Sequence, residues 1–198
     1  METILRLSMT DQIRTFIAIE IPSRIRERIA QLQERLLAVD CQASWVKPAN
    51  IHLTLKFLGD ISRVRMSDVI SGVERAGAAG APFELEIEGC GCFPSPRNPR
   101  VFWIGLHEDE TNSLAKLYAA IESEMARSGF TRDKKPFSPH LTIARLRSPR
   151  NARVLAEQLQ SIGFEAERFT TRDVIVMKSD LNPSGSIYTP LAKIAFTM

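Results

Sequence analysis

The first part of the chain alternates between short apolar runs and stretches in which apolar residues recur at helical spacing. Residues 15–21 (TFIAIEI) form a β-branched run that ends at Pro22, and residues 51–58 (IHLTLKFL) alternate between polar and apolar side chains. Both patterns predict strands. Residues 23–39 and 62–79 carry apolar side chains on one helical face, which predicts two amphipathic helices that lie on a sheet.

The second part of the chain repeats this order of strand, helix, strand and helix. Residues 101–106 and 140–146 have strand patterns, and residues 114–125 and 151–162 have helical spacing. Two copies of one unit tend to pack about a local two-fold axis, so that equivalent strands face each other across a cleft. We therefore expect an α+β fold with two lobes. Further strands are predicted at residues 83–92, 174–178 and 187–196.

The repeat also predicts the domain organisation. The two units, at about 15–79 and 101–162, are not separated by a stretch with the composition of a linker. We therefore expect a single two-lobed domain at residues 11–198. Residues 1–10 are predicted to be an N-terminal tail.

Two of the three histidines stand in nearly the same tetrapeptide, HLTL at His52 and HLTI at His140. Chance alone gives such a coincidence with a probability on the order of one in ten thousand. Because side chains alternate along a strand, the histidine and threonine of each motif share one face, while the aliphatic residues anchor the strand in the core. We expect His52, Thr54, His140 and Thr142 to project into the space between the lobes, with both imidazoles facing solvent and free of core contacts. His107 is expected in an exposed loop.

Two imidazoles and two hydroxyls that converge on one point suit phosphoryl chemistry. Opening a 2',3'-cyclic phosphate needs a water deprotonated on one side of phosphorus and the leaving ribose oxygen protonated on the other. Histidine can serve in either role near neutral pH, and threonine hydroxyls can donate to the non-bridging oxygens. No carboxylate cluster stands beside either histidine in the sequence, so we predict a reaction without a metal ion or other cofactor.

Composition narrows the class of protein. The net charge of +3 is compatible with an anionic substrate. The 3 cysteines lack the spacing of a zinc site and suit a reducing compartment. No stretch approaches the roughly 20 apolar residues that a membrane span needs. We therefore expect a cytoplasmic monomer that makes no membrane contact.

The residues around both motifs resemble a known family. The chain is similar to the two-histidine phosphoesterases, which are named for a doubled HxTx motif, and within them to the RNA 2',3'-cyclic phosphodiesterases, also called 2'-5' RNA ligases. The similarity runs from Arg14 onward and includes WVKPANIHLTLKFLG around His52 and PFSPHLTIARL around His140. The resemblance implies two pseudo-symmetric antiparallel sheets with outer helices and an active-site groove between them.

The resemblance also implies an activity. RNA ends that carry a 2',3'-cyclic phosphate would be hydrolysed to a 2'-phosphate, with His52 as the proton donor to the leaving 3'-oxygen and His140 as the proton acceptor that activates water. The near-symmetry of the motifs makes these two roles easy to exchange. The family is also known for joining or splitting 2'-5' linkages in tRNA halves.

Five residues past each histidine, the family pattern places a functional side chain. Here these are Phe57, which would stack on the terminal base, and Arg145, which would clamp a phosphate. Strict alternation sends both side chains to the core face, so their roles require a bulge or a strand end after each motif. Tyr188 either approaches the site or packs against its hairpin. Other basic residues considered for RNA contact are Lys56, Arg97, Arg100, Arg147, Arg150 and Arg153.

Two alternative functions stay open. An enzyme of the same fold could act on small cyclic nucleotides or 2'-5' oligonucleotides, and the dependence of turnover on substrate length would separate it from an RNA enzyme. The chain could also be a non-catalytic module that binds RNA ends. The paired histidines argue against this second alternative, because binding alone favours arginine and lysine over titrating groups.

Overall fold

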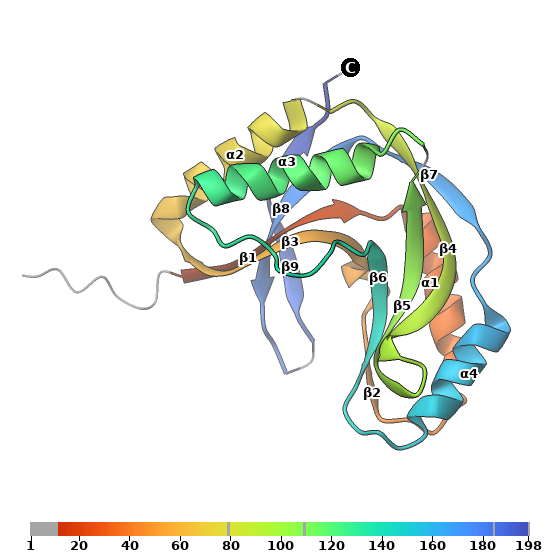
Figure 1. Cartoon of the computed structure of the whole chain (residues 1–198). Coiled ribbons are helices and arrows are strands. Elements are labelled where there is room, and N and C mark those ends of the chain that lie inside the picture. The colour runs from red at the N-terminus through yellow and green to blue at the C-terminus, as the bar shows by residue number, and fades with distance from the viewer. Residues whose placement is uncertain (1–11, 79, 109, 184, 198) are drawn as a thin grey trace, which may run out of the picture.

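Two antiparallel sheets form the framework of the protein (Figure 1). The computed structural model describes residues 12–78, 80–108, 110–183 and 185–197, so the predicted tail at residues 1–10 lies outside the described residues. Sheet A has four strands, in the order β3 (His52–Ser62), β1 (Gln12–Glu20), β8 (Asp173–Asp180) and β9 (Ile187–Ala195). Sheet B has five, in the order β2 (Ala43–Trp45), β6 (His140–Leu146), β5 (Asn98–Glu108), β4 (Phe83–Ser95) and β7 (Glu167–Thr171).

The helices cover the outer faces of both sheets and cross over between the halves of the chain. On sheet A, α2 (Met66–Ala78) packs against α3 (Ser113–Arg127), although α3 belongs to the second half. On sheet B, α4 (Ala152–Ile162) packs beside α1 (Ser23–Leu36), which belongs to the first half. Each sheet is therefore covered by one helix from each half of the sequence. Two single 3-10 turns, Pro48–Asn50 and Arg63–Arg65, complete the helical elements of the described residues.

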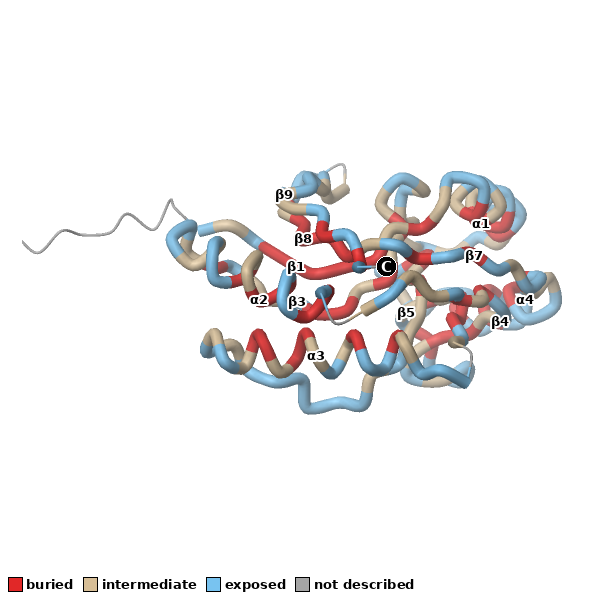
Figure 2. The backbone as a smooth tube through the Cα atoms, turned by 90° about the horizontal axis from the view of Figure 1, so that it is seen from above, coloured by how far each residue is buried: buried red, intermediate tan, exposed pale blue. Residues whose placement is uncertain are grey.

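Strand β1 is buried on both faces, which explains its continuous apolar run (Figure 2). Ile17 and Ile19 join the main hydrophobic core under the helices, and this core includes buried residues of both sheets. On the opposite face, Phe16 and Ala18 form a smaller cluster with Ile175 and neighbouring residues of β8. A strand that separates two apolar layers has no polar face, so its sequence does not alternate.

The structure confirms the predicted α+β class with two antiparallel sheets and outer helices. It also shows two strands that the sequence pattern did not predict, β2 and β7. Both are short edge strands, and β7 (ERFTT) is largely polar, so neither presents a clear apolar alternation. The expectation of a loop at His107 was wrong, because the exposed His107 lies within β5, opposite Glu86 of β4.

Candidate active site

Each HLT motif begins a strand, and each strand carries a bulge at the same place in its motif. In β3, Thr54 pairs with Ala18 of β1 and Lys56 pairs with Ile17, so Leu55 has no partner in the register. In β6, the register against β5 skips Ile143 in the same way. The two motifs therefore share a local backbone irregularity as well as a sequence.

These bulges reverse the alternation of side chains after each threonine. Leu55 and the next residue, Lys56, are both buried, and Phe57 then emerges with 61% of its surface exposed. Arg145 is exposed in the same way after Ile143 and Ala144. The bulge that the family pattern requires is thus present in both strands. Lys56, which was considered for RNA contact, is instead buried, because the bulge breaks the alternation that would place it on the face of His52.

The two histidines make the same backbone contact. Nδ1 of His52 lies 2.7 Å from the carbonyl oxygen of Asn50, and Nδ1 of His140 lies 2.7 Å from the carbonyl oxygen of Ser138. In both cases the acceptor stands two residues before the histidine. Because a carbonyl oxygen can only accept, Nδ1 must carry the proton, so Nε2 of the neutral ring has a free lone pair. Each imidazole is thereby oriented to exchange a proton through Nε2.

Aromatic side chains hold each ring in place. The His52 ring stacks on buried Phe16 with centroids 4.7 Å apart, and Tyr188 meets it edge-on at 5.2 Å. The His140 ring meets Phe93 edge-on at 5.0 Å and lies 6.5 Å from Trp103. His52 was expected to be free of core contacts, and this is wrong. Tyr188, whose position the sequence left open, lies against His52.

The contacts of His52 have an electrostatic consequence. Burial lowers the pKa of His52 below its ordinary value of 6.5, and the hydrogen bond to the Asn50 carbonyl opposes this shift only in part. The free protein therefore holds His52 neutral near pH 7. A bound phosphate would raise this pKa, because a nearby negative charge favours the imidazolium form.

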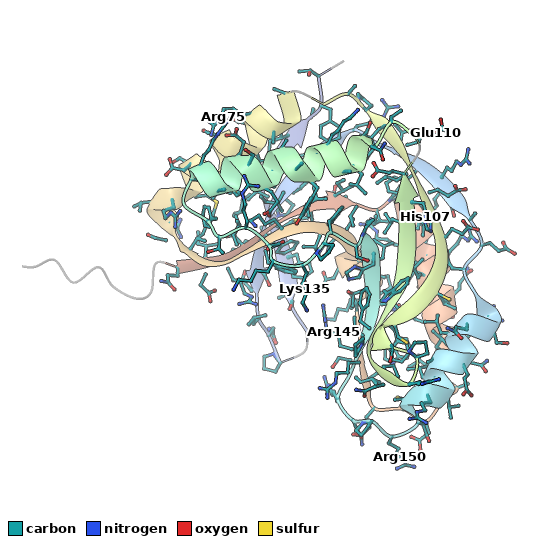
Figure 3. All side chains as sticks on the ribbon, viewed as in Figure 1. Arg75, His107, Glu110, Lys135, Arg145 and Arg150 are labelled. Carbon is teal, nitrogen blue, oxygen red and sulfur yellow. The ribbon has the colours of Figure 1, made fainter. Side chains whose placement is uncertain are left out.

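A groove of about 920 Å³ runs alongside the two motif strands. Strands β3 and β6 contact each other, although they belong to different sheets. Thr54, Phe57 and His140 line the groove, whereas His52, Thr142 and Arg145 are not among its lining residues. In Figure 3, the labelled side chain of Arg145 lies toward the space between the two sheets. Further lining residues are Phe93, Arg100, Tyr118, Lys134, Lys135 and Phe137.

A buried ion pair under the groove joins three elements. The ammonium group of Lys56, on β3, contacts the Glu122 carboxylate of α3 and donates to the Thr131 carbonyl at 3.0 Å. It also lies 3.5 Å from Asp133. The second carboxylate oxygen of Glu122 accepts from the backbone N–H of Asp133 at 3.0 Å. Lys56 thus ties sheet A to the segment that forms one wall of the groove.

Glu122 was not predicted as an important residue, although the sequence contains a signal for its buried ion pair. Glu122 stands on the face of α3 that carries Leu117, Ile121 and Met125, which are all buried. A carboxylate on an apolar helical face needs a partner, because an unpaired buried charge is costly. The sequence does not show that the partner is Lys56, 66 residues earlier in the chain.

Other basic residues considered for RNA contact differ in their surroundings. Arg100 lines the groove. In contrast, Arg150 lies at the far end of sheet B in Figure 3. The three arginines after Arg145 use their donors within the protein, at 2.5 to 2.9 Å: Arg147 to Ser44, Arg150 to Asp40, and Arg153 to the Arg97 carbonyl.

Among the described residues, no cluster of three or more His, Cys, Asp or Glu side chains has the arrangement of a metal site. No helix in this part of the chain combines the length and the apolar character needed to cross a membrane. The three cysteines are free thiols.

Comparison with known proteins agrees with this arrangement. The family model of LigT-like phosphoesterases matches twice in succession, at residues 19–103 and 104–188. The chain belongs to the LigT-like phosphoesterase family. Each match contains one HLT motif, so the doubled motif corresponds to two successive copies of the family unit.

Curated relatives cover almost the whole chain. An RNA 2',3'-cyclic phosphodiesterase of Methanothermobacter thermautotrophicus is 34% identical over 183 residues, which is 91% of this chain and 97% of the relative. A protein of the same name from Thermotoga maritima is 32% identical over 186 residues, which is 92% of this chain and 95% of the relative. Among solved structures, E. coli LigT complexed with 3'-AMP superposes with a TM-score of 0.75 at 25% identity, covering 94% of this chain and 99% of that one.

Proposed function

We propose that this protein hydrolyses 2',3'-cyclic phosphates at RNA ends and leaves a 2'-phosphate. The observation that carries the proposal is the matched pair of imidazoles, each with Nδ1 directed to a backbone carbonyl and Nε2 free for proton exchange. The names of the curated relatives support hydrolysis of an RNA 2',3'-cyclic phosphate. A module that only binds RNA ends would not need two titrating side chains in the same tautomeric arrangement.

In the proposed reaction, water attacks phosphorus and the bond from phosphorus to the 3'-oxygen breaks. His140 accepts the proton of the attacking water at Nε2, and His52 donates the proton that the leaving 3'-oxygen takes up. Thr54 and Thr142 donate to the non-bridging oxygens, whose negative charge grows in the transition state. Arg145 binds the phosphate and Phe57 stacks on the terminal base. No metal ion takes part, so EDTA should leave the rate unchanged.

The lowered pKa of His52 bears on its role as donor. In the free protein His52 is neutral near pH 7, and a donor must first gain a proton. The phosphate that it serves supplies the negative charge that raises its pKa. Substrate binding and protonation of His52 are therefore coupled in this proposal.

The direct test is a product analysis with a short RNA that ends in a 2',3'-cyclic phosphate. We expect a 2'-phosphate, resistant to an enzyme specific for 3'-phosphates, and the same rate in the presence of EDTA. His52→Ala and His140→Ala should each lower kcat by more than 1000-fold, on the order of the loss of a general acid or base. Circular dichroism should show that both variants keep the fold.

Several outcomes would contradict the proposal. Near-normal turnover in either histidine variant would remove the paired mechanism, and a 3'-phosphate product would reverse the assigned direction of ring opening. Binding of the RNA end without turnover would leave only an RNA-end binding module. Equal turnover of a cyclic mononucleotide and an oligonucleotide would favour a small-nucleotide phosphodiesterase.

A 2'-5' RNA ligase activity can be tested in the same assay. For this test, the cyclic-ended RNA is incubated with a second RNA that has a 5'-hydroxyl end.

A further inference from the structure

We propose that a second subsite beside the groove binds the nucleotide on the 5' side of the cyclic end. This inference rests on the proposed function and names the part of the substrate that sets a preference for RNA over a mononucleotide. The subsite is a hollow of about 460 Å³ between β3 and the segment that follows α3. Its lining includes Phe57, Phe130, Arg132 and Lys134.

The hollow continues the groove. Phe57, Asp133 and Lys134 line both spaces, so the two spaces meet at these side chains. The Phe57 ring is 61% exposed at this junction. An exposed aromatic ring presents a face on which a base of any identity can stack. In the proposed function the terminal base stacks on this ring, so the preceding nucleotide would lie beyond it, over the hollow.

The charges at the junction suit a phosphodiester. Arg132 and Lys134 are exposed and have no hydrogen-bond or ion-pair partner among the described residues. Asp133 would repel a phosphate; its carboxylate lies 3.5 Å from the Lys56 ammonium, which Glu122 also contacts. Two cations, Arg132 and Lys134, therefore stand beside Asp133 where the hollow meets the groove, and only Arg132 is confined to the hollow.

The subsite is held in shape by contacts within the protein. Lys56 donates to the Thr131 carbonyl, and Glu122 accepts from the backbone of Asp133, both at 3.0 Å. At the other end of the hollow, the Arg65 guanidinium lies 4.1 Å from the centre of the Phe130 ring. These anchors lie on either side of Arg132. A loop that is ordered before binding loses less conformational entropy when it contacts RNA.

The chemistry of the substrate determines which nucleotide can occupy the hollow. A 2',3'-cyclic phosphate closes the 3' end of an RNA, so the strand continues only in the 5' direction. A dinucleotide with a cyclic end adds one nucleotide and one phosphodiester to the cyclic mononucleotide. The hollow is expected to take this added unit, with its phosphate at Arg132 and Lys134.

The experiment compares kcat/KM for a cyclic-ended dinucleotide with that for the cyclic mononucleotide. We expect the wild-type protein to prefer the dinucleotide and Arg132→Ala/Lys134→Ala to lower that preference roughly tenfold, the order expected from lost charge-assisted hydrogen bonds. Arg132→Ala alone, at a residue that lines only the hollow, should leave the mononucleotide value within about twofold of wild type, since the single phosphate of the mononucleotide lies at the histidines. Arg35→Ala, at an exposed arginine of α1, is the matched control and should leave both values unchanged.

Salt dependence provides a second readout. One added phosphate contact should steepen the fall of log kcat/KM with log salt by about 0.7 for the dinucleotide, and the double variant should lose this difference. An equal preference in the wild-type protein and the double variant would overturn the subsite. So would the absence of any gain from the added nucleotide. Failure to hydrolyse either substrate would instead refute the proposed function.

Discussion

A histidine ring has two nitrogens, and the backbone decides which one is available for chemistry. In this protein both catalytic candidates direct Nδ1 to a carbonyl two residues earlier, so that Nε2 is the free nitrogen in each. The environments then differ. His52 is packed between Phe16 and Tyr188, whereas His140 meets Phe93. Two copies of one motif therefore place their rings in different surroundings, and burial lowers the pKa of His52.

Removal of Tyr188 should raise the pKa of His52. The sign follows from burial, which disfavours the charged ring and so makes His52 lose its proton at a lower pH than a solvated histidine. Tyr188→Ala exposes one edge of the ring, and the pKa should move up toward 6.5. Titration by NMR would measure it. Tyr188→Phe keeps the ring contact and should keep the low pKa, and equal values in the two variants would exclude burial by Tyr188 as the cause.

The two threonines should contribute to turnover more than to binding. Thr54→Ala and Thr142→Ala are each expected to lower kcat by about 10- to 1000-fold, by analogy with the loss of one donor to a developing oxyanion. KM should change less, because the charge on the non-bridging oxygens grows only in the transition state. Steady-state kinetics on a cyclic-ended RNA measures both. Thr54→Ser and Thr142→Ser keep the hydroxyl group and should each retain most of the wild-type rate.

Within the two motif strands, the bulges determine which side chains after each threonine are exposed and which are buried. Without them, Phe57 and Arg145 would point into the core and Lys56 would point to the groove. The irregularity also puts Lys56 where it can meet Glu122 of α3. In β3, the single extra residue thus sets both the exposure of Phe57 in the groove and the ion pair of Lys56 beneath it.

Breaking this ion pair should destabilise the protein strongly. Lys56→Met leaves Glu122 as an unpaired carboxylate in the interior, and the free energy of unfolding should fall by about 3 to 5 kcal/mol. Urea denaturation would measure the change. Lys56→Met/Glu122→Leu removes both charges and should be more stable than Lys56→Met alone, because no buried charge is left without a partner. A double variant with additive losses would show that the two residues act independently.

At the scale of the molecule, the two halves of the sequence do not form separate lobes. Helix α1 lies with α4 on sheet B, and α3 lies with α2 on sheet A, so each half depends on the other for its helical cover. The main hydrophobic core contains residues of both sheets. Both features favour cooperative unfolding of the whole domain.

Unfolding should therefore occur in one transition. Both tryptophans, Trp45 and Trp103, belong to sheet B, so their fluorescence follows that sheet. Far-UV circular dichroism follows both sheets and all helices. We expect the two signals to give the same midpoint in urea. A second transition seen only by circular dichroism would mean that sheet A unfolds independently.

That the protein is a monomer in solution stays a prediction, which sedimentation equilibrium would test.

Strong local patterns made much of the fold predictable. The helices, the two motif strands and the order of elements follow from periodicities of 3.6 and 2.0 residues, which report how each segment is buried. The repeated HLT motif drew attention to His52 and His140 because it recurs at matching places in the chain. Strands β2 and β7 were missed, because short edge strands leave little periodic pattern.

Local spacing and composition are enough to predict the fold class, the repeated unit and the residue types available for chemistry. The folded chain was needed to show how the halves exchange helices, where the bulges turn Phe57 and Arg145 outward, and that Lys56 meets Glu122. It also shows that Phe16 and Tyr188 enclose His52. These features arise from contacts between residues far apart in the chain, and no local pattern records which distant segments will pack together.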